Sequence, residues 1–111
     1  MNIDKILSRL PIKALRDRVP LVPVVRLDGV IAAQGSPLRA ALNISSLAEP
    51  LERAFSMKGA KAVALVINSP GGSPVQSALV HDRIRLLADE NELPVYIFCE
   101  DVAASGGYWI A

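Results

Sequence analysis

The stretch AVALVINSPGGS, residues 62–73, has the pattern of a buried strand that runs directly into a glycine loop. Six consecutive apolar residues, 62–67, are typical of a parallel strand that is covered on both faces of its sheet. A helical pattern follows the loop over residues 75–90, with an apolar stripe that contains Leu79, Val80, Ile84 and Leu87. Strand, loop and helix in this order predict one unit of a parallel α/β fold.

Similar signals lie on both sides of this unit. Residues 22–27 are rich in β-branched side chains and predict a strand, and residues 30–33 predict a second short one. Residues 46–49 have capping-box spacing, so a helix is expected to begin there and to end near Gly59. Residues 94–99 predict another strand. The order strand, helix, strand, helix, strand favours the α/β class with a mainly parallel sheet.

The composition is that of one ordinary globular domain. The chain has 111 residues, 51% of them hydrophobic and 21% charged, and its net charge is +1. This charge gives no indication of a nucleic-acid partner. The single cysteine, Cys99, excludes an internal disulfide and argues against a cysteine-rich metal site, so we expect neither a metal nor a cofactor. Cys99 fits a small core residue in a strand better than a nucleophile.

Residues 1–20 are set apart from a domain that spans residues 21–111. Charged residues interrupt residues 1–18, which therefore do not resemble a signal peptide, and no run is long enough to span a membrane. We therefore expect a cytoplasmic protein. Apolar residues recur there at roughly helical spacing: Ile3, Ile6, Leu7, Leu10 and Leu15. A helix lying on the inner membrane surface and a helix docked on protein both fit, and the break at Pro11 favours docking.

Two glycine loops carry the chemical signal. In the first, Gly71 and Gly72 allow a ligand to approach the main chain closely, next to the start of a helix where negative charge is favoured. In the second, residues 103–108, Ser105 is the hydroxyl among residues with very small side chains, and the N–H group of Gly106 follows it. A nucleophilic serine needs such open approach and nearby backbone donors. The alternatives are a plain strand-to-helix turn for the first loop and a helix N-cap for Ser105.

The spacing of the loops strengthens the functional interpretation. Gly72 and Ser105 are 33 residues apart (105 − 72), and one helix and one strand lie between the loops. Each loop follows a predicted parallel strand, so both are expected at the same sheet edge, where open α/β sheets place their sites. The serine and the backbone donors would then face one crevice.

These residues resemble a known peptidase family. Residues 66–73 (VINSPGGS) together with residues 103–108 (AASGGY) are similar to the signal-peptide-peptidase family, S49, which includes signal peptide peptidase A and SohB-like proteins. The resemblance runs from about Val22 to the end of the chain. It implies the Clp/crotonase fold, a spiral of ββα units, of which this chain would be an N-terminal part that is incomplete at its C-terminus.

The resemblance also implies roles for individual residues. Ser105 is expected to be the nucleophile of a serine–lysine dyad, and Gly71, Gly72 and Gly106 are expected to form the oxyanion hole. The rest of the first loop is expected to contact the substrate: Ser69, Pro70 and Ser73. The implied substrates are peptides, notably signal-peptide remnants or membrane-derived segments, and the implied assembly is a homo-oligomeric ring.

The general base is the point where this chain departs from the family pattern. The lysine of single-domain members lies well downstream of the serine, which here means beyond Ala111. Lys58 and Lys61 precede a predicted strand, so they are expected at the opposite edge of the sheet, and Lys5 and Lys13 lie in the charged N-terminal segment. We therefore expect the 111-residue chain alone to be inactive, and the apolar final residues, 108–111, favour a chain that continues.

Other functions also fit the sequence. A Clp-type peptidase with a Ser-His-Asp triad shares the fold and an SPGG-like loop, but His81 is expected on the polar face of its helix, exposed to solvent. A crotonase-type acyl-CoA enzyme uses similar oxyanion loops without a serine nucleophile, and the setting of Ser105 argues against it. A non-catalytic assembly subunit of the same fold is the alternative from outside the enzymes.

Overall fold

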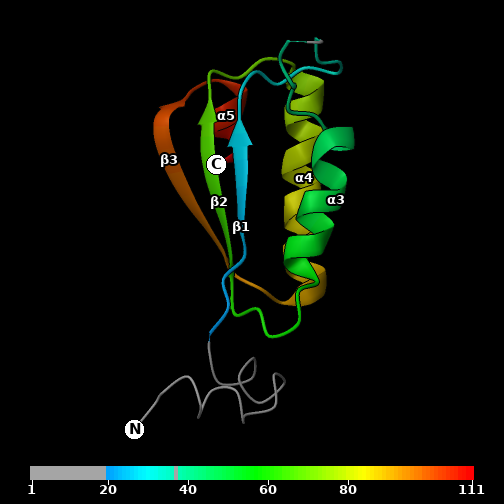
Figure 1. Cartoon of the computed structure of the whole chain (residues 1–111), viewed down its shortest axis with the longest axis vertical. Helices are drawn as coiled ribbons and strands as arrows, with labels where there is room; N and C mark the ends of the chain where they lie inside the picture. Colours follow the sequence, from blue (N-terminus) through cyan, green and yellow to red (C-terminus); the bar gives the residue numbers. More distant parts are fainter. Residues whose placement is uncertain (1–19, 37) are drawn as a thin grey trace, which may run out of the picture.

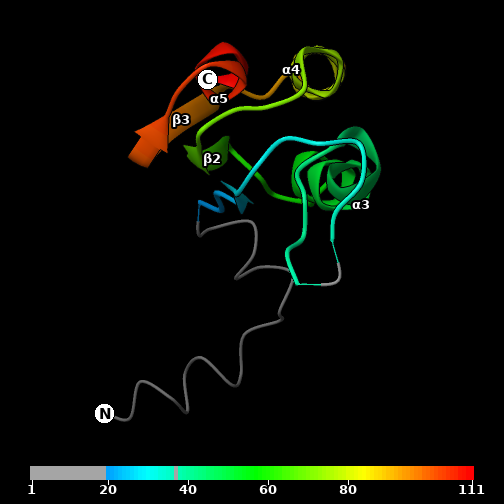
Figure 2. The same ribbon diagram turned by 90° about the horizontal axis from the view of Figure 1, so that it is seen from above.

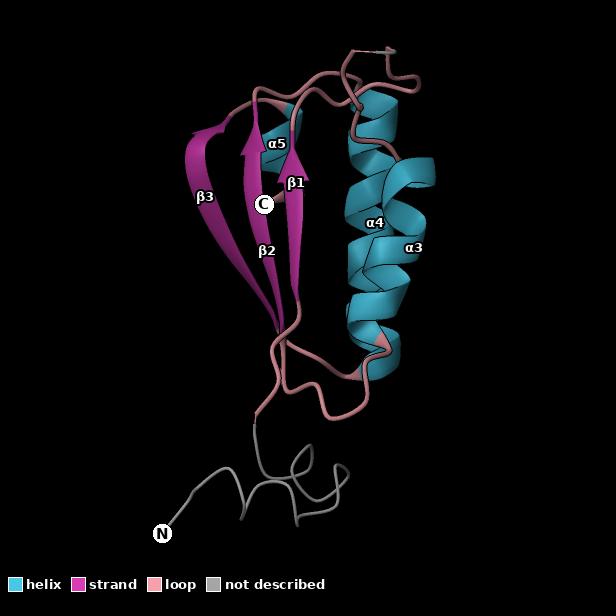
Figure 3. Cartoon of the chain, in the orientation of Figure 1, coloured by secondary structure: helices cyan, strands magenta, loops and turns pink. Residues whose placement is uncertain are grey.

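The computed structural model describes residues 20–36 and 38–111. Three strands form one parallel sheet in the order β1-β2-β3. Figure 1 shows the chain and Figure 3 its helices and strands. The strands are β1 (Val24–Asp28), β2 (Val63–Ser69) and β3 (Val95–Ala103), and the helices are α3 (Ile44–Phe55), α4 (Pro74–Asn91) and α5 (Gly106–Ile110). The predicted α/β class is confirmed, and the arrangement is consistent with a fragment of a ββα spiral.

The helices all lie on one face of the sheet, as the view from above shows (Figure 2). Strand residues alternate accordingly: Val25 and Leu27 of β1 face the helices and are buried, whereas Val24 is 60% exposed. On β3, Tyr96 and Phe98 are each 57% exposed. The described part of the chain therefore has its core between the sheet and the helices, and its other sheet face is open.

The central strand β2 lies at the centre of the hydrophobic core. Val63, Leu65 and Ile67 are at most 1% exposed because neighbouring strands flank them on both sides and helices cover them. Full burial of such a side chain stabilises the fold by roughly 1.5–3 kcal/mol. The helices add their apolar faces, which are Leu47, Leu51, Ala54 and Phe55 of α3 and Val80, Ile84, Leu87 and Ala88 of α4. The predicted stripe of α4 is wrong at Leu79, which is 43% exposed.

Helix α3 begins earlier than the capping-box pattern predicted. Asn43 is the N-cap, its side chain accepts from the backbone N–H of Ser46 at 2.8 Å, and Ser46 Oγ accepts in turn from the backbone N–H of Asn43 at 3.1 Å. Ser46 is therefore the third helical residue and not the cap. Pro50 then lies inside the helix, which nevertheless continues because its apolar face packs on the sheet and α4.

Two strand predictions need correction. Residues 30–33 do not form a strand: Ile31 makes only single bridges, to Leu42 and to Gly72. Strand β3 runs on to Ala103, four residues beyond the predicted end. Cys99 is exposed on this strand and is not a core residue. The segment 1–19, for which a surface or docked helix was predicted, lies outside the described residues.

None of the helices in residues 20–36 and 38–111 is long and apolar enough to cross a membrane. Over the same residues no group of three or more His, Cys, Asp and Glu side chains could hold a metal ion.

Candidate functional site

The two glycine loops start side by side at the carboxyl edge of the sheet. β2 and β3 are parallel neighbours, and their last residues, Ser69 and Ala103, are partners in the ladder. The N–H of Ala104 then donates to the carbonyl of Ser69 at 3.1 Å. The topology thus brings together the loop after Ser69 and the loop after Ala103, as the sequence predicted.

Ser105 stands exposed on the second loop in a conformation that is unusual for its residue type. Its φ is 51° and its ψ is −121°, a positive φ that side chains disfavour by about 1–2 kcal/mol. It occupies the N-cap position of α5, but its side chain makes no capping hydrogen bond. Ser105 thus holds the N-cap position without capping the helix through its side chain, and its hydroxyl makes no hydrogen bond among the described residues. Such outliers persist where the surrounding structure holds them and are frequent at active sites.

The main chain of the first loop lies directly against Ser105. Gly71 is buried at φ 98°, and a β-carbon built on it would lie 2.7 Å from Ser105 Cβ and 2.8 Å from the nitrogen of Gly106. Gly107 is as close to the end of β2, since a β-carbon there would lie 2.8 Å from the carbonyl oxygen of Ser69. Glycine at these positions is what lets the two loops touch.

The backbone N–H groups of the glycines in the two loops differ in whether they already have an acceptor. The N–H of Gly71 already donates to Ser69 Oγ at 3.1 Å. The N–H of Gly72, in contrast, finds no acceptor among the described residues, and Gly72 is exposed. Gly106 is the first residue of α5, so its N–H has no acceptor within the helix. Donors of this kind stabilise an oxygen on which negative charge develops, and of the two glycines of the first loop Gly72 is the freer one.

The three residues expected to contact substrate differ in their exposure and their hydrogen bonds. Ser69 is 1% exposed, and its hydroxyl is engaged with Gly71 inside the loop. Ser73 is the N-cap of α4 and accepts from the N–H of Gln76 at 3.2 Å. Pro70 is exposed. Of these three side chains, Pro70 is thus the one free to meet a ligand, while Ser69 and Ser73 support the loop.

Ser77 is a further support that the sequence pattern did not reveal. It is fully buried, its Oγ donates to the carbonyl of Ser73 at 2.7 Å, and it packs against Gly106 so closely that a β-carbon there would lie 2.2 Å from Oγ. A larger residue at either position would separate α4 from the start of α5.

No basic side chain among the described residues forms a hydrogen bond with Ser105, and the two lysines described lie far from it. Lys58 and Lys61 precede β2, whereas the loops follow it, and a seven-residue strand spans about 20 Å. They are at the opposite edge, as predicted. His81 lies on α4 with its side chain 35% exposed and its ring 3.3 Å from Asp82, so it is half-buried and not fully solvated. Lys5 and Lys13 fall outside the described residues.

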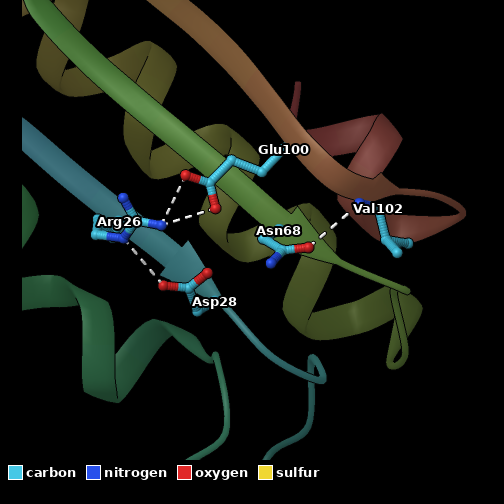
Figure 4. Close-up of polar contacts among 5 residues, drawn as sticks. All are labelled: Arg26, Asp28, Asn68, Glu100 and Val102. Carbon is cyan, nitrogen blue, oxygen red and sulfur yellow. Dashed lines mark hydrogen bonds and ion pairs between the residues drawn. The ribbon is translucent and has the colours of Figure 1, made fainter.

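A polar cluster on the open face of the sheet stands beside the two loops (Figure 4). The Oδ1 atom of Asn68 accepts from the N–H of Val102 at 3.2 Å. Arg26 donates to both carboxylate oxygens of Glu100 at 2.7 and 2.8 Å and to Asp28 at 3.2 Å. The hydrogen bond to Glu100, followed by the one to Asp28, raises the pKa of Arg26 above its ordinary value. Sequence reasoning missed this cluster, whose one signal was a polar residue, Asn68, at the end of an apolar strand.

Comparison with known proteins gives two kinds of relative. The chain is 53% identical over 106 residues to the Na⁺/H⁺ antiporter NhaA of Brucella melitensis, a match that covers 96% of this chain and 14% of the antiporter. It is 32% identical over 112 residues to Protease 4 of Haemophilus influenzae, covering 100% of this chain and 18% of the protease. It is 36% identical over 93 residues to the chloroplastic serine protease SPPA of Arabidopsis thaliana, covering 81% of this chain and 13% of that protein.

No family model matches the chain. The chain spans between 13% and 18% of the length of these three relatives, so their names describe proteins much longer than the segment compared. Similarity to proteins named as proteases agrees with the expected peptidase in general terms.

Proposed function

We propose that this chain carries the nucleophile and the oxyanion donors of a serine peptidase of the S49 kind. Ser105 is the nucleophile, and the N–H groups of Gly72 and Gly106 receive the oxyanion. The observation that supports this most strongly is the exposed, uncapped Ser105 at positive φ, packed against the main chain of Gly71. Similarity to Protease 4 and to serine protease SPPA supports the same reaction class.

In the proposed reaction Ser105 Oγ attacks the carbonyl carbon of a peptide bond. A neutral base takes the serine proton and returns it to the leaving amine, and water then releases the acyl group from the serine. We propose that the base is a lysine downstream of Ala111 in the full natural protein, as the family resemblance implies, since Lys58 and Lys61 lie at the far edge of the sheet. By this proposal the 111-residue chain alone does not turn over peptides.

Peptides are the proposed substrates. The antiporter name is not extended to this chain, because the exposed Ser105 beside the glycine loops supports hydrolysis and no helix of the described residues is long and apolar enough to cross a membrane. Pro70 and Gly72, both exposed beside Ser105, offer the surface on which a peptide main chain could lie.

The decisive experiment replaces the nucleophile in the full natural protein. Ser105→Ala is expected to lower cleavage of a fluorogenic peptide library at least about 10³-fold, since losing a nucleophile removes the covalent route. Ser45→Ala is the matched control, because Ser45 is an exposed serine on α3, far along the chain from both loops. Cleavage by Ser105→Ala at the rate of the Ser45→Ala control would overturn the proposal.

A further inference from the structure

The end of β3 is irregular where it approaches the candidate nucleophile. Ile67 pairs with Cys99, and Ser69 pairs with Ala103. Two residues of advance along β2 (69 − 67) thus correspond to four along β3 (103 − 99), so Asn68 alone stands opposite residues 100–102. A β-bulge of this kind bends a strand and redirects the residues that come after it.

The bulge shortens the stretch of chain between the last β2–β3 pair and Ser105. In a regular ladder Asp101 would pair with Ser69, and Ser105 would then come four residues after the pair. In the bulged ladder Ser105 comes two residues after the partner of Ser69. At about 3.3 Å per extended residue, the difference is roughly 6–7 Å of chain. The bulge therefore accounts for the contact between Ser105 and Gly71.

Asn68 supplies the bond that the irregular ladder lacks. The carbonyl of Asn68 accepts from the N–H of Gly29 on the β1 side at 3.0 Å, and its side-chain Oδ1 accepts from the N–H of Val102 on the β3 side at 3.2 Å. Asn68 on β2 thus binds both the residue that follows β1 and the bulged end of β3. Asn68 is half-buried, and Figure 4 shows the bond between its side chain and Val102.

An ion pair with β1 also contacts the bulge. Arg26 crosses β2 to the carboxylate of Glu100, one of the three residues opposite Asn68. Both side chains are about half exposed, at 55% and 40%, so this ion pair is screened by solvent. The bond from Asn68 is exposed as well, but it is the one made directly to the main chain of the bulge.

We propose that Asn68 is a positioning residue: by accepting from the Val102 N–H it holds the β3 bulge that places Ser105 against Gly71. The inference rests on the proposed role of Ser105 as nucleophile. Asn68 touches no reacting atom and acts through the main chain of β3. Because a displacement of about 1 Å at a reacting atom can cost about 10²-fold in rate, losing one hydrogen bond here affects reactivity far more than folding.

The test measures covalent labelling of Ser105 in the full natural protein by a fluorophosphonate probe, in which the serine oxygen displaces fluoride from phosphorus. Asn68→Leu keeps the approximate size of the side chain and removes the acceptor, whereas Asn68→Asp keeps an acceptor oxygen. We expect Asn68→Leu to lower the labelling rate at saturating probe by about 10- to 100-fold without changing the probe concentration for half-maximal rate. Asn68→Asp is expected to stay within about fivefold of the natural protein.

The matched control is Asn91→Leu, which makes the same change at an exposed position near the end of α4, and it is expected to label at the natural rate. Hydrogen exchange supplies a readout apart from reactivity: the Val102 amide should exchange faster in Asn68→Leu and at the natural rate in Asn91→Leu. Equal labelling of Asn68→Leu and the natural protein would overturn the positioning role. Absence of labelling in the natural protein would instead overturn the nucleophile, so the two failures are distinguishable.

Discussion

Gly72 lies against the main chain of Ile31 so closely that a β-carbon on residue 72 would stand 2.0 Å from the carbonyl oxygen of Ile31. Hydrogen bonds hold the contact on both sides: Ile31 N–H donates to Gly71 O at 3.0 Å, and Ser73 N–H donates to Ile31 O at 2.8 Å. The first glycine loop is thus fastened to the segment that follows β1, which fixes the direction of its N–H groups.

This contact predicts the effect of Gly72→Ala. The new β-carbon meets a backbone atom and not a flexible side chain, and φ at this position is 148°, so the loop must shift. We expect the variant to lose about 2–4 kcal/mol of unfolding free energy, measured by urea denaturation of the chain. Gly29→Ala is the control, because Gly29 has φ 106° but its nearest contact would be 3.7 Å away, and it should lose only about 1–2 kcal/mol. Equal losses would show that the contact with Ile31 does not matter.

The backbone conformation of Ser105 predicts a trade between stability and activity. Ser105→Gly removes the cost of a side chain at φ 51°, partly offset by the greater freedom of glycine in the unfolded chain, and should stabilise the chain by about 0.5–1 kcal/mol. Ser105→Ala keeps the cost and should not stabilise it. Thermal or urea unfolding of the two variants of the chain makes the comparison, and in the full natural protein both substitutions should abolish peptide cleavage. A Ser105→Gly chain less stable than Ser105→Ala would contradict the conformation described.

The residue at the C-terminal end of α4 has a backbone conformation that glycine adopts more easily. Glu92 is the C-cap in the left-handed region, with φ 52° and ψ 43°, and the N–H of Leu93 closes the end on the carbonyl of Ala88 at 3.0 Å. Glu92→Gly should therefore stabilise the chain by about 1 kcal/mol in urea denaturation. Glu90→Gly, two residues earlier inside the helix and also exposed, should instead destabilise it by roughly 0.5–1 kcal/mol. The same sign for both variants would refute the assigned helix end.

The sequence predicted strands and helices well where one local pattern was strong. The apolar run at residues 62–67 overlaps β2 (Val63–Ser69), and the pattern at residues 75–90 matches α4 to within one residue at each end. The meeting of the two loops also followed from sequence, because parallel strands end at one edge. Asn43 was missed as the cap of α3 because Ser46 and Glu49 have the usual capping-box spacing, whereas the box that forms joins Asn43 and Ser46.

The failures lie where long-range pairing decides. Nothing local distinguishes a strand that ends at Cys99 from one that bulges and continues to Ala103, since the extra residues are accommodated by Asn68 on another strand. Cys99 was placed in the core because its neighbours are apolar, yet β3 has one open face and flanks only one strand in the described chain.

By itself, the sequence determined the parallel α/β class, the two glycine loops and the candidate serine, because apolar periodicity and glycine content act over a few residues. Only the tertiary structure decided that Ser105 has a positive φ and makes no side-chain cap, and that a bulge brings it to the first loop. Only the structure also showed that the Gly71 N–H has an acceptor, whereas the Gly72 N–H has none among the described residues. The bulge and the contact between Ser105 and Gly71 join segments 30 or more residues apart, which packing sets and local pattern does not.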